Sequence, residues 1–250
     1  MHYSLKAGLL LAGILSPLAS QALTASRADL AAFLGTTKEA IEAINPRLGN
    51  EDVDVTRGSA LRRTLNVNAG DTLTFDWLFG TDEGTSGDDI IDYAFFSVDG
   101  LLTRLASGDD PLVPSAGRTS FDEYHAPFGP GAVPAFQAMG ITFANSGLVT
   151  IGFAVVDVTD TIVSSGLILD NFRSATLQLD NAGFEDDLLF NLWEVIGDAD
   201  AWTEVPSAPE GNLAAMLFTG NGPAEVPLPA GVWLLGSALA TLGWRRHRRG

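Results

Sequence analysis

Short runs in which apolar and polar residues alternate, with turn-forming residues between the runs, restrict the fold of this chain more than any other feature. Residues 72–79 read TLTFDWLF, in which alternate positions are occupied by Leu73, Phe75, Trp77 and Phe79. Successive side chains of a β-strand point to opposite faces, so this pattern is typical of a strand with one face in a core. Gly70 and Asp71 precede the run as a turn signal.

Further strand patterns follow along the chain. Residues 93–98 are apolar and aromatic, and the Asp99-Gly100 pair after them is a strong hairpin signal that makes residues 101–106 the partner strand. Residues 148–158 are nearly all apolar, as in a central strand that is buried on both faces. Residues 167–179 are predicted to form another long strand. We therefore expect an all-β fold, an antiparallel β-sandwich of jelly-roll-like form.

Two short helices are expected before the sheets, and one long loop within them. Residues 28–34 end at Gly35, and residues 38–44 follow Thr37, so both segments carry the capping residues of a helix. Residues 108–139 are rich in Pro and Gly and predict a surface loop. Loops of this length are usually functional or mobile.

The charge distribution restricts the partners of the chain. Residues 23–225 contain all 31 acidic residues but only nine of the 14 Lys and Arg residues. This excludes nucleic acid as a partner, because phosphate binding needs clustered Lys and Arg. An acidic surface suits divalent cations or a polysaccharide without strong negative charge. The chain has no cysteine, which excludes disulfides and thiolate chemistry.

The first residues have the pattern of a secretory signal peptide. Residues 1–22 contain Lys6, an apolar run over residues 7–15, and small residues before a cleavage site after Ala22. The alternative is a buried N-terminal helix. A signal peptide predicts an exported protein whose mature chain begins at Leu23.

The last residues predict a membrane segment. Residues 226–250 read VPLPAGVWLLGSALATLGWRRHRRG, with no charge before Arg245. A helix over residues 226–244 would be about 28 Å long, just enough to cross a bilayer, but its prolines favour a start near residue 229. The span over residues 229–244 is therefore marginal. The basic tail would stay in the cytoplasm and place residues 23–222 outside. The basic tail is formed by Arg245, Arg246, Arg248 and Arg249.

This ending resembles the PEP-CTERM class of bacterial sorting signals, in its VPLPA variant. The motif residues are Val226, Pro227, Leu228, Pro229 and Ala230. Motif, short membrane segment and Arg-rich tail stand in the family's order. The resemblance implies that an exosortase-type membrane protease recognises the chain in a bacterium that makes exopolysaccharide. A plain tail anchor is the alternative.

The middle of the chain is similar to a β-sandwich domain common in PEP-CTERM proteins and related to choice-of-anchor domains. The similarity covers residues 23–179 and is carried by GDTLTFDWLFGTDE, DYAFFSV and GLVTIGFAVVDVTDTIVSSGLILDNF. This chain departs from the family pattern at Gly80, Ile91, Thr159 and Ser164. The family has no agreed activity, so the resemblance implies a fold rather than a function.

Residues 179–202 are similar to the NGGFETG opening of the same kind of domain, yet they follow the sheet instead of preceding it. We interpret residues 179–220 as circularly permuted strands that complete the same sandwich. The alternative is a truncated second domain, which at this length would bury little core.

Catalytic patterns are sparse. Residues 23–225 hold one histidine, His125, inside the predicted loop, and none of the common hydrolase motifs. A pair of carboxylates for glycoside hydrolysis remains an alternative, because acidic residues are abundant. We expect a protein that is not an enzyme.

Clustered acidic residues at predicted strand ends favour a structural calcium ion. Hard oxygen ligands on loops suit Ca²⁺, although a solvated acidic loop is the alternative. The candidate ligands are Asp82, Glu83, Asp88, Asp89, Asp92, Asp157, Asp160 and Asp170.

Three functions are compatible with these patterns. The first is an exported, non-enzymatic protein of the cell surface or extracellular matrix that associates with exopolysaccharide. The second is a calcium-dependent carbohydrate-binding module, and the third is a glycan hydrolase. A carbohydrate-binding face needs exposed aromatic side chains. The alternative is that the candidate aromatic residues pack within the loop. The clustered candidates are Phe121, Tyr124, Phe128 and Phe136.

Overall fold

A computed structural model describes residues 24–46, 54–81, 91–110, 118–119, 136–159, 165–186, 190–203 and 208–220. The elements in these ranges are β1 (Ala25–Ser26), α1 (Arg27–Leu34), α2 (Lys38–Ala43), β2 (Val55–Val67), β3 (Thr72–Thr81), β4 (Tyr93–Val98), β5 (Leu101–Ser107), β6 (Arg118–Thr119), β7 (Gln137–Thr142), β8 (Gly147–Val158), β9 (Ser165–Arg173), β10 (Glu194–Ile196), β11 (Asp198–Trp202) and β12 (Ala214–Phe218).

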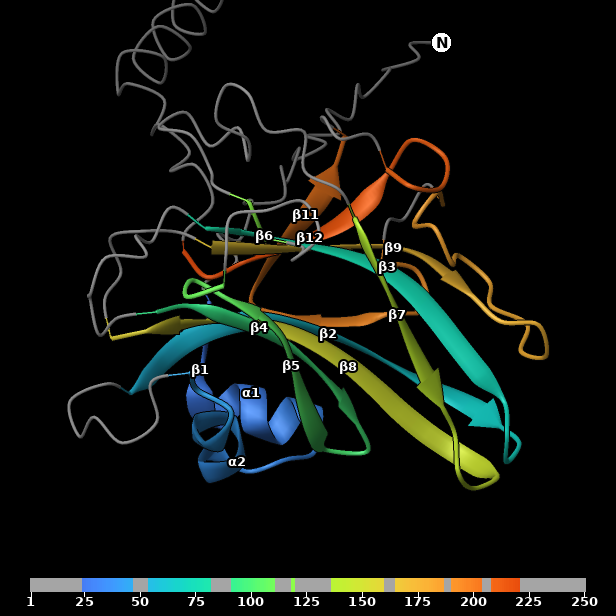
Figure 1. Ribbon diagram of the computed structural model, residues 1–250, viewed down its shortest axis with the longest axis horizontal. Helices are drawn as coiled ribbons and strands as arrows, with labels where there is room; N and C mark the ends of the chain where they lie inside the picture. Colours follow the sequence, from blue (N-terminus) through green and yellow to red (C-terminus); the bar gives the residue numbers. More distant parts are fainter. Residues whose placement is uncertain are drawn as a thin grey trace, which may run out of the picture.

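The strands form two sheets that face each other (Figure 1). Sheet A has the order β1-β2-β8-β4-β5, with β10 also on β2, and sheet B has the order β11-β12-β9-β3-β6, with β7 also on β3. Every pair is antiparallel except the short contact between β3 and β6. The predicted all-β antiparallel sandwich is confirmed.

The alternation of side chains along β8 explains how a central strand is buried on both faces. Phe153 and Val155 face the interior between the sheets, whereas Ala154 and Val156 face the helices. The prediction for this strand is therefore confirmed from Ile151 onward, while Leu148 at its start is exposed.

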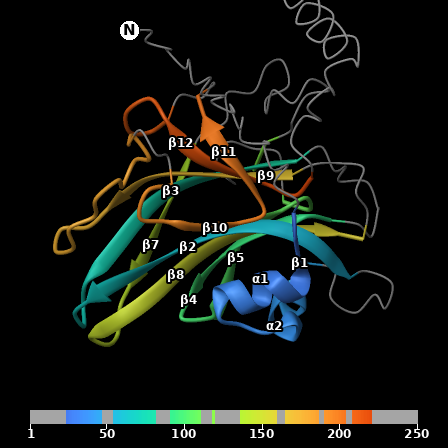
Figure 2. The ribbon, with the colours of Figure 1, turned by 180° about the vertical axis from the view of Figure 1, so that it is seen from behind.

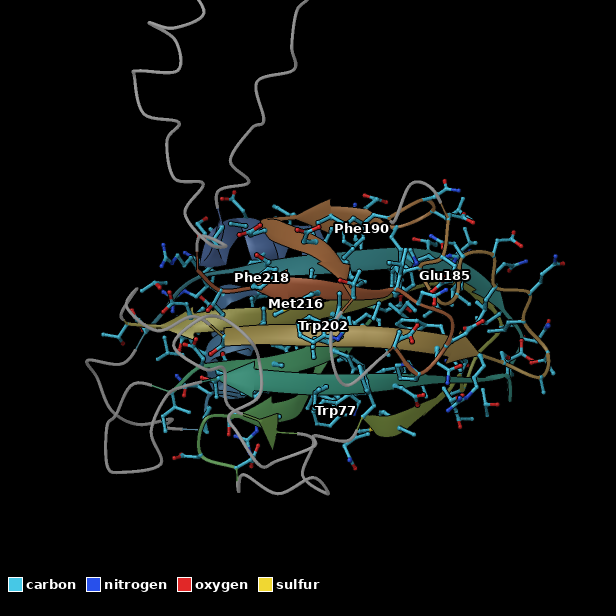
Figure 3. The ribbon with its side chains drawn as sticks, turned by 90° about the horizontal axis from the view of Figure 1, so that it is seen from above. Trp77, Glu185, Phe190, Trp202, Met216 and Phe218 are labelled. Carbon is cyan, nitrogen blue, oxygen red and sulfur yellow. The ribbon has the colours of Figure 1, made fainter. Side chains whose placement is uncertain are left out.

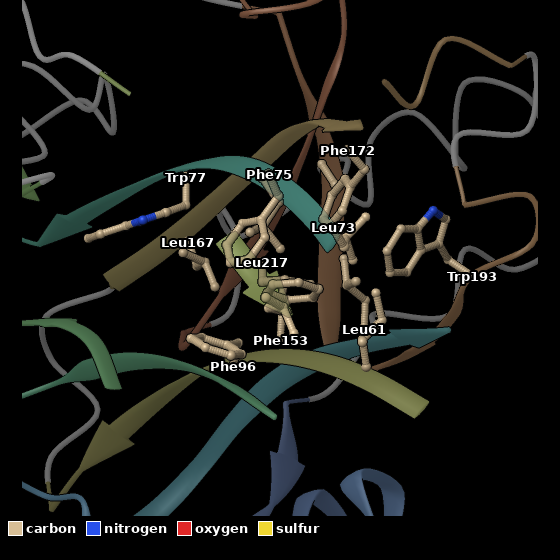
Figure 4. Packing of buried hydrophobic residues seen from close by; sticks show 14 of the residues in the cluster. Leu61, Leu73, Phe75, Trp77, Phe96, Phe153, Leu167, Phe172, Trp193 and Leu217 are labelled. Atoms are coloured by element: carbon tan, nitrogen blue, oxygen red, sulfur yellow. The ribbon is translucent and has the colours of Figure 1, made fainter. Parts of the chain in front are cut away.

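Aromatic rings from both sheets fill the interior (Figure 4). Phe75 of β3 lies edge-on to Phe153 of β8 at 4.8 Å and is stacked with Phe172 of β9 at 5.6 Å. Trp193 contacts Phe172 at 5.0 Å between ring centres, and Phe184 at 5.5 Å. Burial of each such ring contributes about 1.5–3 kcal/mol, so this cluster is the main core of the molecule.

The two helices cover the outer face of sheet A (Figure 2). Ser26 caps α1 by accepting a hydrogen bond from Asp29 N, and Gly35 ends it in the left-handed conformation with φ of 68°. Thr37 caps α2 in the same way. Both predicted helices are confirmed. Their capping residues are local sequence signals, which is why the helices could be predicted.

One lateral side of the sandwich is closed by a strand that passes from sheet A to sheet B. β10 pairs with β2, the chain turns at Gly197 with φ of 90°, and β11 pairs with β12 (Figure 2). Ser59 of β2 fastens this corner, since its hydroxyl donates to Phe218 O at 2.6 Å and accepts from Asp198 N at 2.7 Å. A Cβ at Gly197 would lie 2.4 Å from Ser59 Oγ, so only glycine fits there.

Residues 179–220 thus contribute strands to both sheets, and Phe184 and Leu217 lie in the main core. Circular permutation, an inference about ancestry, stays a prediction.

One strand is shorter than predicted. β9 ends at Arg173 and not at Leu179, because the Ser174 hydroxyl accepts hydrogen bonds from Thr176 N and Leu177 N and turns the chain. In the predicted loop over residues 108–139, β6 and the start of β7 are described, and most of the remainder lies outside the described residues.

Candidate functional site

Among the predicted calcium ligands that the structure describes, Asp170 lies apart from Asp92 and Asp157. Asp92, Asp157 and Asp170 are described and fully buried. Asp170 is five residues beyond Ser165 along β9, which corresponds to about 17 Å of strand. It therefore lies far from the start of β9. The predicted ligands that lie outside the described residues are Asp82, Glu83, Asp88, Asp89 and Asp160.

The first two carboxylates lie at one end of the sandwich, named the polar end here and formed by Arg57, Thr81, Asp92, Asp157, Ser165 and Thr219. Asp92 accepts hydrogen bonds from Val158 N at 2.9 Å and from the Thr219 hydroxyl at 3.2 Å. The Thr219 hydroxyl also accepts from Ser165 N at 2.8 Å. The Asp92 carboxylate therefore connects a strand end of sheet A to strand ends of sheet B.

Asp157 of β8 continues the inward-facing row of Phe153 and Val155. Its Oδ2 accepts from Arg57 Nε at 2.8 Å, and the two residues are register partners on β8 and β2. Ion pairing with a neighbour on the adjacent strand compensates the burial of this charge. The described partners of Asp92 and Asp157 are thus protein groups that join strands.

The third carboxylate, Asp170, lies on sheet B, where β9 passes under the loop of residues 208–213. Its Oδ2 accepts from Glu210 N at 2.8 Å, while its Oδ1 is buried and has no hydrogen-bond partner. Burial raises the pKa of Asp170 to about 7. The nearby backbone N–H groups of Glu210 and Asn171 lower this pKa, and the negative charges of Glu210 and Glu185 raise it.

Two loops meet above Asp170 at what we name the loop junction, formed by Asp170, Gly183, Glu185, Glu210, Gly211, Asn212 and Leu213. Glu185 Oε1 accepts from Asn212 N at 2.8 Å and Leu213 N at 2.7 Å. A Cβ on Gly211, where φ is 66°, would lie 2.3 Å from Glu185 Cδ. A Cβ on Gly183 would lie 2.8 Å from Glu210 Oε2. Gly211 also has a positive φ, so a substitution there is strained, whereas a side chain at Gly183 would meet the flexible side chain of Glu210.

Asp76 has a basic partner, whereas Asp170 has none in the described chain. Asp76 of β3 is the register partner of Asp170, so two buried carboxylates stand opposite each other on adjacent strands. Asp76 accepts from Asn171 Nδ2 at 2.7 Å and from Arg173 at 3.0 Å. In the described chain no Lys or Arg forms an ion pair with Asp170, Glu185 or Glu210.

Glu185 was not among the residues singled out from the sequence. The sequence signal that could have identified Glu185 is its position in the segment GFEDD, which supported only the domain resemblance. Figure 3 shows Glu185 toward the end of sheet B to which β9 runs, beyond Trp202 and Met216.

Of the four aromatic candidates for carbohydrate binding, the structure describes Phe136. Phe136 is partly buried and packs against an apolar cluster on sheet B that contains Ile168, Trp202 and Met216. Trp202 and Met216 are themselves buried (Figure 3). Phe121, Tyr124, Phe128 and His125 lie outside the described residues.

The signal-peptide, sorting-motif and basic-tail residues also lie outside the described residues. In the described ranges no helix is long and apolar enough to cross a membrane. Across those same ranges, no three His, Cys, Asp or Glu side chains form a group that would hold a metal ion by themselves.

No protein family, curated protein or solved structure matches the chain.

Proposed function

We propose that this chain is an exported, non-enzymatic protein of the cell surface or extracellular matrix. It is sorted by an exosortase-type membrane protease and associates with exopolysaccharide. The observation that carries the proposal is the pairing of a signal peptide over residues 1–22 with a VPLPA-type ending over residues 226–250. The C-terminal segment holds the chain in the inner membrane, with residues 23–222 outside the cytoplasm.

The described sandwich is compatible with this role. Its acidic residues form ion pairs and hydrogen bonds that join strands, as at the polar end. The described residues contain no histidine and no cysteine. We also propose that the sandwich is a jelly-roll variant with permuted C-terminal strands, supported by the pairing of β12 with β9 and of β10 with β2.

The proposal is tested by the fate of the full chain in a bacterium with an exosortase-type protease. The wild-type chain is expected to reach the cell surface or medium without the residues that follow about Pro229, as shown by intact mass. The double variant Pro227→Ala, Pro229→Ala is expected to stay in the inner-membrane fraction with an intact tail.

Pro223→Ala is the matched control, because it changes a proline outside the motif and should be processed like the wild type. An intact tail on the wild-type chain in the membrane fraction would show that the C-terminal segment is an unprocessed membrane anchor. Equal processing of the double variant would contradict recognition of the motif. Binding on a glycan array, or turnover of released polysaccharide, would instead favour a carbohydrate-binding module or a hydrolase.

A further inference from the structure

The Oδ1 atom of Asp170 needs a partner that the described protein does not supply. The side chain is 0% exposed, and this oxygen accepts no hydrogen bond. Buried carboxylates are ordinarily paired, hydrogen-bonded or bound to a metal. The nearest described cation along the strand, Arg173, is paired with Asp76. A proton or an external cation must therefore occupy this place.

The backbone around Asp170 favours a cation. Asp170 and Glu185 each direct one oxygen at N–H groups of residues 210–213, which fixes the orientation of both carboxylates. The second oxygen of each then accepts no hydrogen bond from the described residues. Glu185 is exposed at the surface, whereas Asp170 is buried beneath the same loop.

We propose that Asp170 Oδ1 and the carboxylate of Glu185 bind one calcium ion between residues 181–186 and residues 209–213. Ca²⁺ takes six to eight oxygen ligands, which include backbone carbonyls and waters as well as carboxylates. At this site the two carboxylates would be joined by backbone carbonyls and water to complete such a set.

A calcium ion would neutralise negative charges at the loop junction. Burial raises the pKa of Asp170 most, and the like charges of Glu210 and Glu185 raise it further. A divalent cation removes this repulsion and compensates the desolvation of Asp170. Glu210 contributes its backbone N–H to Asp170 and its negative charge to the junction.

The ion would fasten two loops of the C-terminal segment to sheet B. Residues 181–186 lead into Trp193 of the core, and residues 209–213 lead into β12. Extracellular calcium modules bind with dissociation constants of about 10⁻⁴–10⁻³ M. The inference stands on the loop junction alone, and failure of the proposed sorting function would leave it unchanged.

Thermal unfolding of the full chain in mild detergent tests the site. With about 5 mM CaCl₂ instead of chelator, the wild-type melting temperature is expected to rise by about 5 °C. Asp170→Asn and Glu185→Gln are expected to lose this rise. Asp200→Asn changes an exposed carboxylate of β11 and should keep it. Magnesium should give a smaller rise, because it demands a near-ideal octahedral shell.

In chelator, Asp170→Asn is expected to melt at or above the wild-type temperature, because an uncharged amide replaces a desolvated carboxylate. This result shows that the variant folds, so that its lost calcium response is meaningful. An unchanged wild-type midpoint with calcium would overturn the proposal and leave a proton on Asp170. An equal calcium response in Asp170→Asn would overturn it as well.

Discussion

The polar end and the loop junction both bury carboxylates in the same sandwich, but they compensate the charge in different ways. At the polar end, Asp157 is paired with Arg57 on the adjacent strand, and Asp92 accepts two hydrogen bonds from strand ends. At the loop junction, Asp170 has one hydrogen bond from a loop N–H and one oxygen without any.

The difference follows from what surrounds each group. The polar end is bounded by paired strands, whose register fixes a basic side chain beside an acidic one. The loop junction is bounded by two turns, whose backbone donates N–H groups while their side chains, Glu185 and Glu210, add negative charge. The buried charge at the polar end has a basic neighbour, whereas the described part of the loop junction has none and depends on a proton or a cation.

The largest effect is expected from removal of the charge at the polar end. Asp157→Asn should lower the free energy of unfolding by about 3–5 kcal/mol, because loss of one partner leaves a largely buried charge on Arg57. Urea unfolding of the variant measures this, with Asp200→Asn as the exposed control. A loss below about 1 kcal/mol would show that the polar end does not depend on its ion pair, and the contrast with Asp170→Asn would disappear.

The pH dependence in chelator should reveal the loop junction. The folded-state pKa of Asp170, about 7, lies above the ordinary value of 3.8, so the folded chain holds this proton where the unfolded chain has lost it. The stability that this proton contributes is therefore lost as the pH rises from 4 to about 8. One pKa unit corresponds to about 1.4 kcal/mol, and relaxation of the carboxylate toward solvent reduces the expected total loss to roughly 2 kcal/mol.

The quantity to measure is the difference in unfolding free energy between wild type and Asp170→Asn across that pH range. Subtraction removes the contribution of carboxylates that do not interact with Asp170. A difference that does not change with pH would show that Asp170 is ionised throughout, or that it is not desolvated.

The smallest effect concerns the glycines of the loop junction. Gly211→Ala combines a positive φ with a contact against Glu185, whereas Gly70→Ala has a positive φ and open space around the new Cβ. We expect Gly70→Ala to cost about 1 kcal/mol and Gly211→Ala about 1 kcal/mol more, with a weaker calcium response. Chemical unfolding of both variants checks this. Equal losses would show that the approach of Glu185 to Gly211 is not needed.

Much of the fold could be predicted from local patterns. The strand over residues 72–79, the Asp99-Gly100 hairpin and the caps of both helices follow from local signals, and the structure confirms them. The second face of β3 is also buried from Asp76 onward, which the alternation did not predict. The early end of β9 depends on one hydroxyl at Ser174, which the apolar pattern does not reveal.

The candidate site was harder to predict, because its partners are far apart in sequence. Nothing near Asp157 indicates that Arg57, a hundred residues away, is its neighbour. Acidic residues are abundant in the sequence, yet Asp170 is separated from the polar end by five residues of β9. Glu185 becomes relevant only when Asn212 and Leu213 are seen to donate to it.

Native mass spectrometry of the full chain in mild detergent tests most directly whether the loop junction needs an external cation. With calcium present, the account predicts one bound calcium ion on the wild-type chain and on Asp200→Asn, and none on Asp170→Asn. A wild-type chain that binds no calcium at millimolar concentration, or an Asp170→Asn chain that binds it as well as the wild type, would contradict the account.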